Sequence, residues 1–324
     1  MEKKSGLIFA YLLDEQGGGQ LWNWEKVENW SPDQGLIWIH IDFSDDYAME
    51  WLHKKSGLSE VVCEALVEEG TRPRINTTPD GTLIILRGVN CNPGADPDDM
   101  VGLRMLLSDR RIITMRQRRI MAVDDVRRTV ETGDGPVSVG DFFVMVAERI
   151  VNRTGDVIVD IDDRVDEIED SVLTGETADL RPKLADLRRQ SISLRRYIAP
   201  QRDMLSRMLV EKVAFVDDRD RMLLKEIAER TARYVEDIDA ARERAGITQE
   251  ELNNRLSEQM NKAMYLLSIV AAIFLPLGLI TGLLGINVGG IPGTENHLAF
   301  VFVTLGLVIV ALALVAVFRR IKWL

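Results

Sequence analysis

One stretch near the C-terminal end carries the residues whose types and spacing are chemically most distinctive. They recur at alternating intervals of three and four positions: Asn261, Met264, Ser268, Ala271, Leu275, Gly278 and Gly282. This heptad spacing places them on one helix face, hereafter the seam. The seam has no carboxylate, histidine or cysteine. A divalent ion meeting only amide and backbone oxygens keeps much of its water, because Mg²⁺ dehydrates reluctantly and a Zn²⁺ cage needs nitrogen or sulfur ligands.

The seam runs into the first of two apolar segments. Tyr265–Leu284 and Leu298–Phe318 contain no charged residue, and about 20 helical residues cover the roughly 30 Å hydrocarbon core of a bilayer. A pair of buried soluble helices is the alternative, but the second segment has no polar face to meet water. We therefore expect a transmembrane hairpin over residues 265–324.

Basic residues flank this hairpin but are absent from its loop. Lys262 precedes the first segment, and Arg319, Arg320 and Lys322 follow the second, whereas residues 285–297 contain no Lys or Arg. Positively charged flanks stay inside, so we expect cytoplasmic termini and a short periplasmic loop. The start of the sequence lacks the apolar region of a signal peptide, which predicts that the first 260 residues stay in the cytosol.

One hairpin cannot enclose a pore. If the seam lines one, several copies must gather with their first membrane helices inside and their second helices outside. Alternatively, the seam only packs the hairpin on itself, because small residues such as Gly278 and Gly282 permit close helix packing. Periodicity alone leaves both possibilities open.

The part before the hairpin has the composition of a soluble protein. Residues 1–260 hold 36 basic and 50 acidic side chains. Strand candidates are Leu7–Leu13, Leu36–Ile41, Thr82–Val89, Val101–Leu107 and Arg111–Met115, and helix candidates are Glu60–Glu69 and Asp124–Glu131. These elements predict a cytoplasmic α/β domain over residues 1–140 with a mixed or antiparallel sheet.

Long helices are expected after Gly140. Asp141–Leu173 and Ala178–Phe215 predict an antiparallel pair over residues 141–216. A stalk helix over 217–264 can continue into the membrane, since no proline follows Asp217 until Pro276. Breaks are expected near Gly175, Pro200 and Gly246. The fold class is thus α+β: an α/β domain, a long helical stalk and a two-helix hairpin.

Two charge clusters allow more than one interpretation. Residues 156–179 hold ten carboxylates and one arginine, Arg164. They can concentrate cations, but no EF-hand spacing occurs and a solvated helix face is favoured. The basic stretch contains Arg104, Arg110, Arg111, Arg116, Arg118, Arg119, Arg127 and Arg128. Without interleaved aromatic residues it favours surface ion pairing over nucleic-acid binding, and no nucleic-acid partner is expected.

Enzymatic chemistry has little support in the sequence. His40 and His53 stand without an evident nucleophile or paired base, so both are expected to pack structurally. Cys63 and Cys91 form no CxxC motif, which excludes a disulfide scaffold or a zinc finger. No phosphate-binding GxxxxGK[ST] loop is present, so the sequence shows no motif of this kind to support ATP-driven pumping. We expect neither an enzyme nor a cofactor.

A family resemblance begins at Gly285-Ile286-Asn287, between the two apolar segments. There the sequence resembles the CorA family of divalent metal-ion transporters, whose signature is Gly-Met-Asn; isoleucine replaces methionine here. The continuation Val288–Gly293 resembles the zinc-transporting ZntB branch, as do the segments Thr71–Arg74, Tyr197–Asp203 and Lys322–Leu324. The resemblance covers nearly the whole chain.

The resemblance implies a funnel-shaped homopentamer in the bacterial inner membrane. Its pore residues, carried over by position, are Asn261, Met264, Leu275, Gly278, Gly282 and Asn287, and the seam adds Ser268 and Ala271. Gly285, Ile286 and Asn287 would form a selectivity filter. The Asn287 carbonyl can accept hydrogen bonds from ion-bound water, whereas a fixed charge would bind a dication too tightly to release it. Gly285 would let the backbone turn tightly beside it.

The functional expectation is transport of a divalent metal ion, zinc first. Glu295 and His297 in the loop can recruit cations, although His297 is more simply a loop residue. The membrane potential favours uptake, with proton coupling and efflux both left open. The alternatives are a magnesium or cobalt channel of the CorA type and a membrane-tethered scaffold. In a scaffold, Gly285 and Asn287 would need no particular role.

Overall fold

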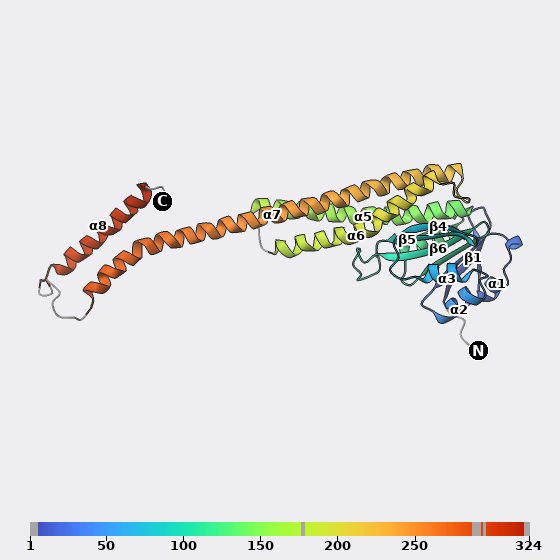
Figure 1. Ribbon diagram of the computed structural model, residues 1–324, viewed down its shortest axis with the longest axis horizontal. Helices are drawn as coiled ribbons and strands as arrows, with labels where there is room; N and C mark the ends of the chain where they lie inside the picture. The colour runs from blue at the N-terminus through green and yellow to red at the C-terminus, as the bar shows by residue number, and fades with distance from the viewer. Residues whose placement is uncertain (1–5, 176–178, 287–292, 294–295, 321–324) are drawn as a thin grey trace. The chain divides into compact units, whose positions relative to one another are not determined.

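The computed structural model describes residues 6–175, 179–286, 293 and 296–320. The chain forms two compact units, residues 1–249 and 250–324, and the division falls within one long helix. Figure 1 shows the order of the elements along the chain.

A seven-stranded mixed sheet is the centre of the first unit. Its strand order is β2-β1-β3-β7-β6-β5-β4, and β3 and β7 are parallel while the other neighbours are antiparallel. The strands are β1 Leu7–Leu13, β2 Gly19–Trp22, β3 Ile37–Asp42, β4 Arg74–Thr78, β5 Gly81–Gly88, β6 Val101–Ser108 and β7 Arg111–Arg116. The five strands predicted from sequence are confirmed to within a residue, whereas β2 and β4 were not predicted.

Both faces of the sheet are buried, so its central strands are apolar on both sides. Along β3, Trp38 belongs to one core and Ile37, Ile39 and Ile41 belong to the other. The first core includes residues of α4 and α5, and the second includes residues of α1, α2 and α3. The short helices are α1 Trp24–Glu28, η1 Pro32–Gln34, α2 Asp46–Lys54, α3 Glu60–Val67 and α4 Met121–Thr132.

Three long helices follow the sheet: α5 Val139–Thr174, α6 Leu180–Val210 and α7 Asp218–Leu284. The predicted break at Gly175 is confirmed, because Gly175 caps α5 in the left-handed conformation, with φ 87°. The predicted breaks at Pro200 and Gly246 are wrong. Both residues lie inside continuous helices.

Packing explains why the helices continue through these two positions. Proline in a helix interior costs about 3 kcal/mol, but Ile198, Gln201 and Leu205 around Pro200 are buried. The Gln201 side chain also accepts a hydrogen bond, 2.9 Å long, from the Arg87 backbone N–H on β5. Around Gly246, Ala245 and Thr248 are buried, so the glycine cost of about 1 kcal/mol is outweighed.

The acidic stretch of α5 is partly neutralised by α7. Arg244 of α7 forms ion pairs with Asp162, Asp166 and Glu169, and Arg164 of α5 pairs with Asp186 of α6. Hydrogen bonds to Glu169 and Asp166 raise the pKa of Arg244. The stretch is therefore an interhelical contact over part of its length, in addition to a solvated face.

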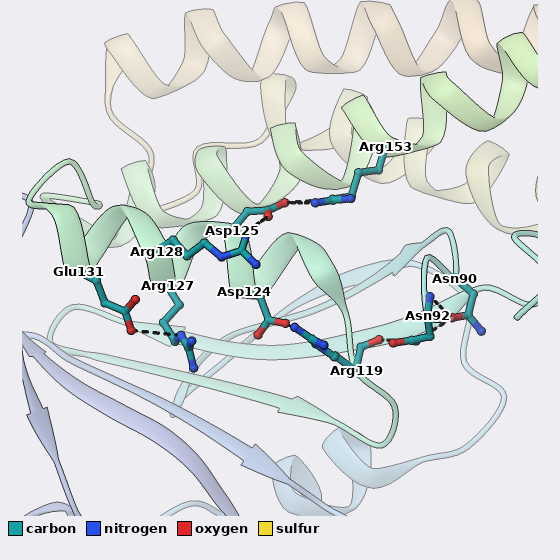
Figure 2. A network of polar contacts seen from close by, with 9 residues as sticks. All are labelled: Asn90, Asn92, Arg119, Asp124, Asp125, Arg127, Arg128, Glu131 and Arg153. Carbon is teal, nitrogen blue, oxygen red and sulfur yellow. Dashed lines mark hydrogen bonds and ion pairs between the residues drawn. The ribbon is translucent and has the colours of Figure 1, made fainter. Parts of the chain in front are cut away.

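Most of the predicted basic stretch forms ion pairs, as expected. Arg110, Arg118, Arg119, Arg127 and Arg128 each pair with a carboxylate. Figure 2 shows Arg127 and Arg128 on α4 and Arg119 just before it, and Asp125 contacts both Arg128 and Arg153. Arg104 is an exception: it is buried and bonds to the Glu68 backbone carbonyl at 2.9 Å.

The second unit contains the C-terminal part of α7 and the helix α8 Ala299–Arg320. Both helices are long and apolar enough to cross a membrane, by length and composition. The two apolar segments predicted from sequence thus coincide with helical structure. Residues 321–324, with the Lys322–Leu324 segment, lie outside the described residues.

Candidate functional site

The seam lies on a single uninterrupted helix, because α7 extends from Asp218 to Leu284. Six of its seven residues are exposed and Ala271 is half-buried. Met264 is 56% exposed and Leu275 is 71% exposed, although both side chains are apolar. The helix therefore presents the predicted residues together along one face that the described part of one chain leaves open.

A second stripe of α7 is covered instead. Ile269 is only 6% exposed, and Ala272, Ile273, Pro276 and Ile280 are half-buried. At 100° per residue this stripe lies on the side of the helix away from the seam. Along α8 the half-buried residues also recur every three or four positions: Val303, Leu307, Val310, Leu314 and Phe318. Each helix of the second unit thus has one stripe that is less exposed than the rest of its surface.

The sequence reasoning did not identify the covered stripe. Its signal was present, because Ile269, Ile273, Pro276 and Ile280 repeat with the same spacing as the seam, rotated around the helix. Small residues drew attention to the seam alone. Large apolar residues at heptad spacing are the signal that identifies this stripe.

The glycines of the seam have no packing partner within the described part of one chain. A Cβ added at Gly278 or Gly282 would meet no atom within 4 Å. Each glycine costs a helix about 1 kcal/mol relative to alanine. Nothing in the described part of the single chain offsets that cost.

The hydroxyl groups of this helix donate to its own backbone. Ser268 Oγ donates to the Met264 carbonyl at 2.8 Å, and Thr281 Oγ1 donates to the Leu277 carbonyl at 3.0 Å. A hydroxyl that donates inward keeps its oxygen lone pairs for an outside donor. Ser268, exposed on the seam, can therefore accept a hydrogen bond from water or from the water around an ion.

The end of α7 is compact at Gly285. Its backbone N–H contacts the Thr281 carbonyl at 2.9 Å and the Gly282 carbonyl at 3.2 Å. A Cβ there would lie 3.1 Å from the Thr281 carbonyl oxygen, tighter than side chains normally tolerate. Glycine thus suits this helix end.

The remaining predicted site residues are placed only in part. Ile286 is 49% exposed and His297 is exposed. Asn287 and Glu295 lie outside the described residues. Over the described ranges, no cluster of three or more His, Cys, Asp or Glu side chains could hold a metal ion.

Known proteins similar to this chain are transporters. Residues 33–320 match the family described as "CorA-like Mg2+ transporter protein". The divalent cation transporter CmaX of Pseudomonas aeruginosa is 40% identical over 323 residues, covering 98% of this chain and 97% of the relative. The zinc transport protein ZntB of Yersinia pseudotuberculosis is 35% identical over 320 residues, covering 99% and 97%.

A solved structure supports the same relationship. The full-length CmaX structure superposes with a TM-score of 0.86 at 38% identity and covers 99% of each chain. These matches confirm the resemblance first seen at Gly285 and in the two apolar segments, and they confirm ion transport in place of enzymatic catalysis. The chain therefore belongs to the CorA family, whose members transport divalent cations.

Proposed function

We propose that this protein carries Zn²⁺ into the cytoplasm through a pore formed by five copies of the chain in the bacterial inner membrane. The first membrane helix of each copy, the C-terminal part of α7, lines the pore with the seam, and α8 lies outside it. Both termini are cytoplasmic, and the loop of residues 285–297 faces the periplasm.

The exposed seam is the observation that carries this proposal. Along α7, Ile269 is buried and Pro276 is half-buried, while Asn261, Ser268 and Gly282 are exposed. Large aliphatic residues such as Leu266 and Leu279 are exposed as well, so it is the composition of the seam that distinguishes it. A lipid-facing helix surface is normally large and aliphatic. A surface of small and hydroxyl or amide residues instead suits an aqueous path or a close contact between copies.

Passage of an ion that keeps part of its water follows from the chemistry of the seam. Its polar atoms are the Asn261 amide, the Ser268 hydroxyl and backbone carbonyls, none of which carries a charge. Such groups hydrogen-bond to the hydration shell without replacing it, and neutral oxygens release a dication readily. In this proposal Gly285, Ile286 and Asn287 form the filter at the outer mouth, and Glu295 and His297 recruit cations beside it.

The choice of zinc as the proposed ion rests on the names of the sequence relatives. The choice of uptake as the direction rests on the electrical energy of the membrane potential. The ZntB relative is named for zinc and the CmaX relative for divalent cations. An inside-negative potential contributes about 2.3 kcal/mol per charge per 100 mV, so entry of a dication through an uncoupled pore gains about twice that. Neither membrane segment holds an acidic, basic or histidine side chain to relay protons.

A magnesium channel is the second candidate, favoured by one feature of the described residues. They contain no cluster of zinc-type ligands, and hydrated passage along neutral oxygens suits Mg²⁺ or Co²⁺ equally well. The two ions therefore have to be separated by measurement.

The decisive experiment reconstitutes the purified chain into liposomes that contain an ion-sensitive dye. We expect Zn²⁺ influx that grows with an inside-negative potential, and imposed pH gradients will report proton coupling. Flux of Mg²⁺ without any flux of Zn²⁺ would assign the protein to the second candidate. Absence of flux for every divalent ion tested would leave only the tethered scaffold.

A further inference from the structure

A polar cleft lies in the first unit, remote in sequence from the seam. Its volume is about 560 Å³, and it is lined by residues of β5, β6 and α6 and by the loop before β6. Four arginines contribute to its lining: Arg87, Arg104, Arg118 and Arg196. Nothing in the transport proposal uses them.

Two of these arginines are almost completely buried. Arg87 is 9% exposed and Arg104 is 5% exposed. Arg87 donates to the backbone carbonyls of Thr71, at 2.9 and 3.2 Å, and of Met100, at 3.3 Å. Arg104 donates to the Glu68 carbonyl at 2.9 Å, and its buried Nε has no acceptor among the described residues.

The sheet register brings the two guanidinium groups together. Arg87 of β5 lies opposite Gly102 of β6, and Arg104 follows two residues later on the same face. A Cβ built at Gly102 would lie 3.3 Å from Arg87 Cζ and 3.5 Å from Arg104 Nη1. Because Gly102 has no side chain, both guanidinium groups can lie close to the β6 backbone where it lines the cleft.

Neither of the two buried arginines forms a direct ion pair with a carboxylate in the described part of the chain, although Glu69 and Glu68 attract Arg104 and Asp99 attracts Arg87 at longer range. Their hydrogen-bond acceptors are backbone carbonyls, and aromatic rings lie against them, Tyr197 at 4.9 Å from Arg87 and Phe43 at 4.4 Å from Arg104. Burial and the neighbouring Arg87 charge lower the pKa of Arg104 to about 10. Buried charges in proteins are ordinarily paired, because their desolvation is costly.

We propose that this cleft binds a small phosphate-bearing anion through Arg87 and Arg104. A guanidinium carries five N–H donors in a planar fork that matches phosphate oxygens, and here several of those donors lack an acceptor. The volume exceeds that of a bare phosphate and falls in the range of metabolite sites. Carboxylates of Glu69, Asp98 and Asp99 also line the cleft and disfavour an extended polyanion such as nucleic acid.

The test is isothermal titration of the full chain in detergent and metal-free buffer, with inorganic phosphate, pyrophosphate, ATP and adenosine as separate probes. We expect at least one phosphate compound to bind and adenosine not to bind. Arg104→Gln and Gly102→Asp should each weaken binding by about tenfold or more, because one removes a cation and the other supplies a tethered carboxylate between the two cations.

Arg128→Gln is the matched control, since Arg128 is a surface arginine paired with Asp125 outside the cleft; it should bind as the wild type does. Gly102→Asp keeps both arginines, so it still tests whether the cleft binds the phosphate compound if Arg104→Gln does not fold. Lack of binding by the wild type, equal binding of adenosine and ATP, or unchanged binding by both cleft variants would overturn the proposal. Zinc flux is not part of this readout, so failure here leaves the transport proposal untouched.

Discussion

At the scale of single residues, His40 shows how the sheet fixes the protonation of a buried side chain. His40 Nδ1 lies 2.8 Å from Thr114 Oγ1, which also accepts from Trp38 Nε1 at 2.9 Å and donates to the Ile39 carbonyl at 3.2 Å. With its own hydrogen directed to Ile39, the Thr114 hydroxyl acts as acceptor to His40. The proton therefore sits on Nδ1, and Nε2 is buried without a partner among the described residues.

The pH dependence of stability follows from this arrangement. Burial, followed by the charge of Arg116, lowers the pKa of His40 to about 3. Between that value and the unfolded value of about 6.5 the unfolded chain binds the extra proton, so stability falls with decreasing pH by up to about 1.4 kcal/mol per unit. Thermal unfolding followed by tryptophan fluorescence should show this fall, and His40→Asn should make the slope shallower.

His53→Asn serves as the control for this prediction. His53 is partly exposed and pairs with Glu60 at 3.3 Å, so its removal should leave the acid slope in place. An unchanged slope in His40→Asn would show that carboxylates alone cause the acid sensitivity.

Asn287 is the residue on which the filter proposal depends most. Asn287→Ala would remove the hydrogen bonds that the side chain accepts from the hydration shell of the ion. Hydrogen bonds that involve a charged group contribute about 1.5–3 kcal/mol each, so we expect Zn²⁺ flux to fall about tenfold or more. The thermal midpoint should not change. Asn296→Ala, in the same loop, is the matched control because the Asn296 side chain only accepts from the Leu298 backbone N–H. Equal flux in wild type and Asn287→Ala would remove Asn287 from the filter.

At the scale of elements, two helix-interior glycines with opposite surroundings test how the long helices pack. A Cβ on Gly155 of α5 would clash with the Tyr234 hydroxyl of α7, whereas a Cβ on Gly246 would meet nothing within 4 Å. Helix propensity alone favours alanine at both positions by about 1 kcal/mol.

We therefore expect the same substitution to change the stability of the protein in opposite directions at the two positions. Gly246→Ala should raise the thermal midpoint of the first unit by about 2–4 °C, while Gly155→Ala should lower it because Tyr234 has to move. The two variants are controls for each other, since both make the same chemical change. If Gly155→Ala also stabilises the protein, the α5–α7 contact at Tyr234 is looser than described.

Much of the element-level structure could be predicted because burial imposes it on local sequence. Strands β1, β3 and β6 are buried at most positions and are therefore apolar runs. In contrast, β4 is a mostly polar strand at the sheet edge, and β2 is a four-residue strand with three exposed residues. Such strands carry no apolar pattern, because only pairing with a neighbour defines them.

Contacts between distant segments could not be read from local pattern. Three such contacts depend on strand register and on helix packing. They are the parallel pairing of β3 with β7, the ion pairs of Arg244 with α5, and the proximity of Arg87 to Arg104. The seam was predictable because its period lies within one helix. The less exposed stripe that contains Ile269 and Ile280 has the same period, so periodicity alone does not separate the two.

At the scale of the whole molecule, the proposed function requires several copies of the chain. One α7 helix presents one exposed seam, and a single seam cannot surround an ion. The glycines at 278 and 282, which contact nothing within the described part of one chain, acquire a role only when further copies or an aqueous path lie beside them. A membrane-tethered scaffold explains none of these features.

The mass of the intact particle distinguishes a pore made of five chains from a membrane-tethered scaffold. We expect native mass spectrometry or light scattering in mild detergent to give five times the 36.6 kDa chain mass. Gly282→Leu, which places a large side chain on the seam, should shift the particle toward smaller species or block Zn²⁺ flux, because five such side chains would meet at the axis. Leu279→Val, at an exposed apolar position off the seam, should alter neither. A monomer or dimer as the wild-type particle would exclude a closed pore, since two helices cannot enclose a hydrated ion.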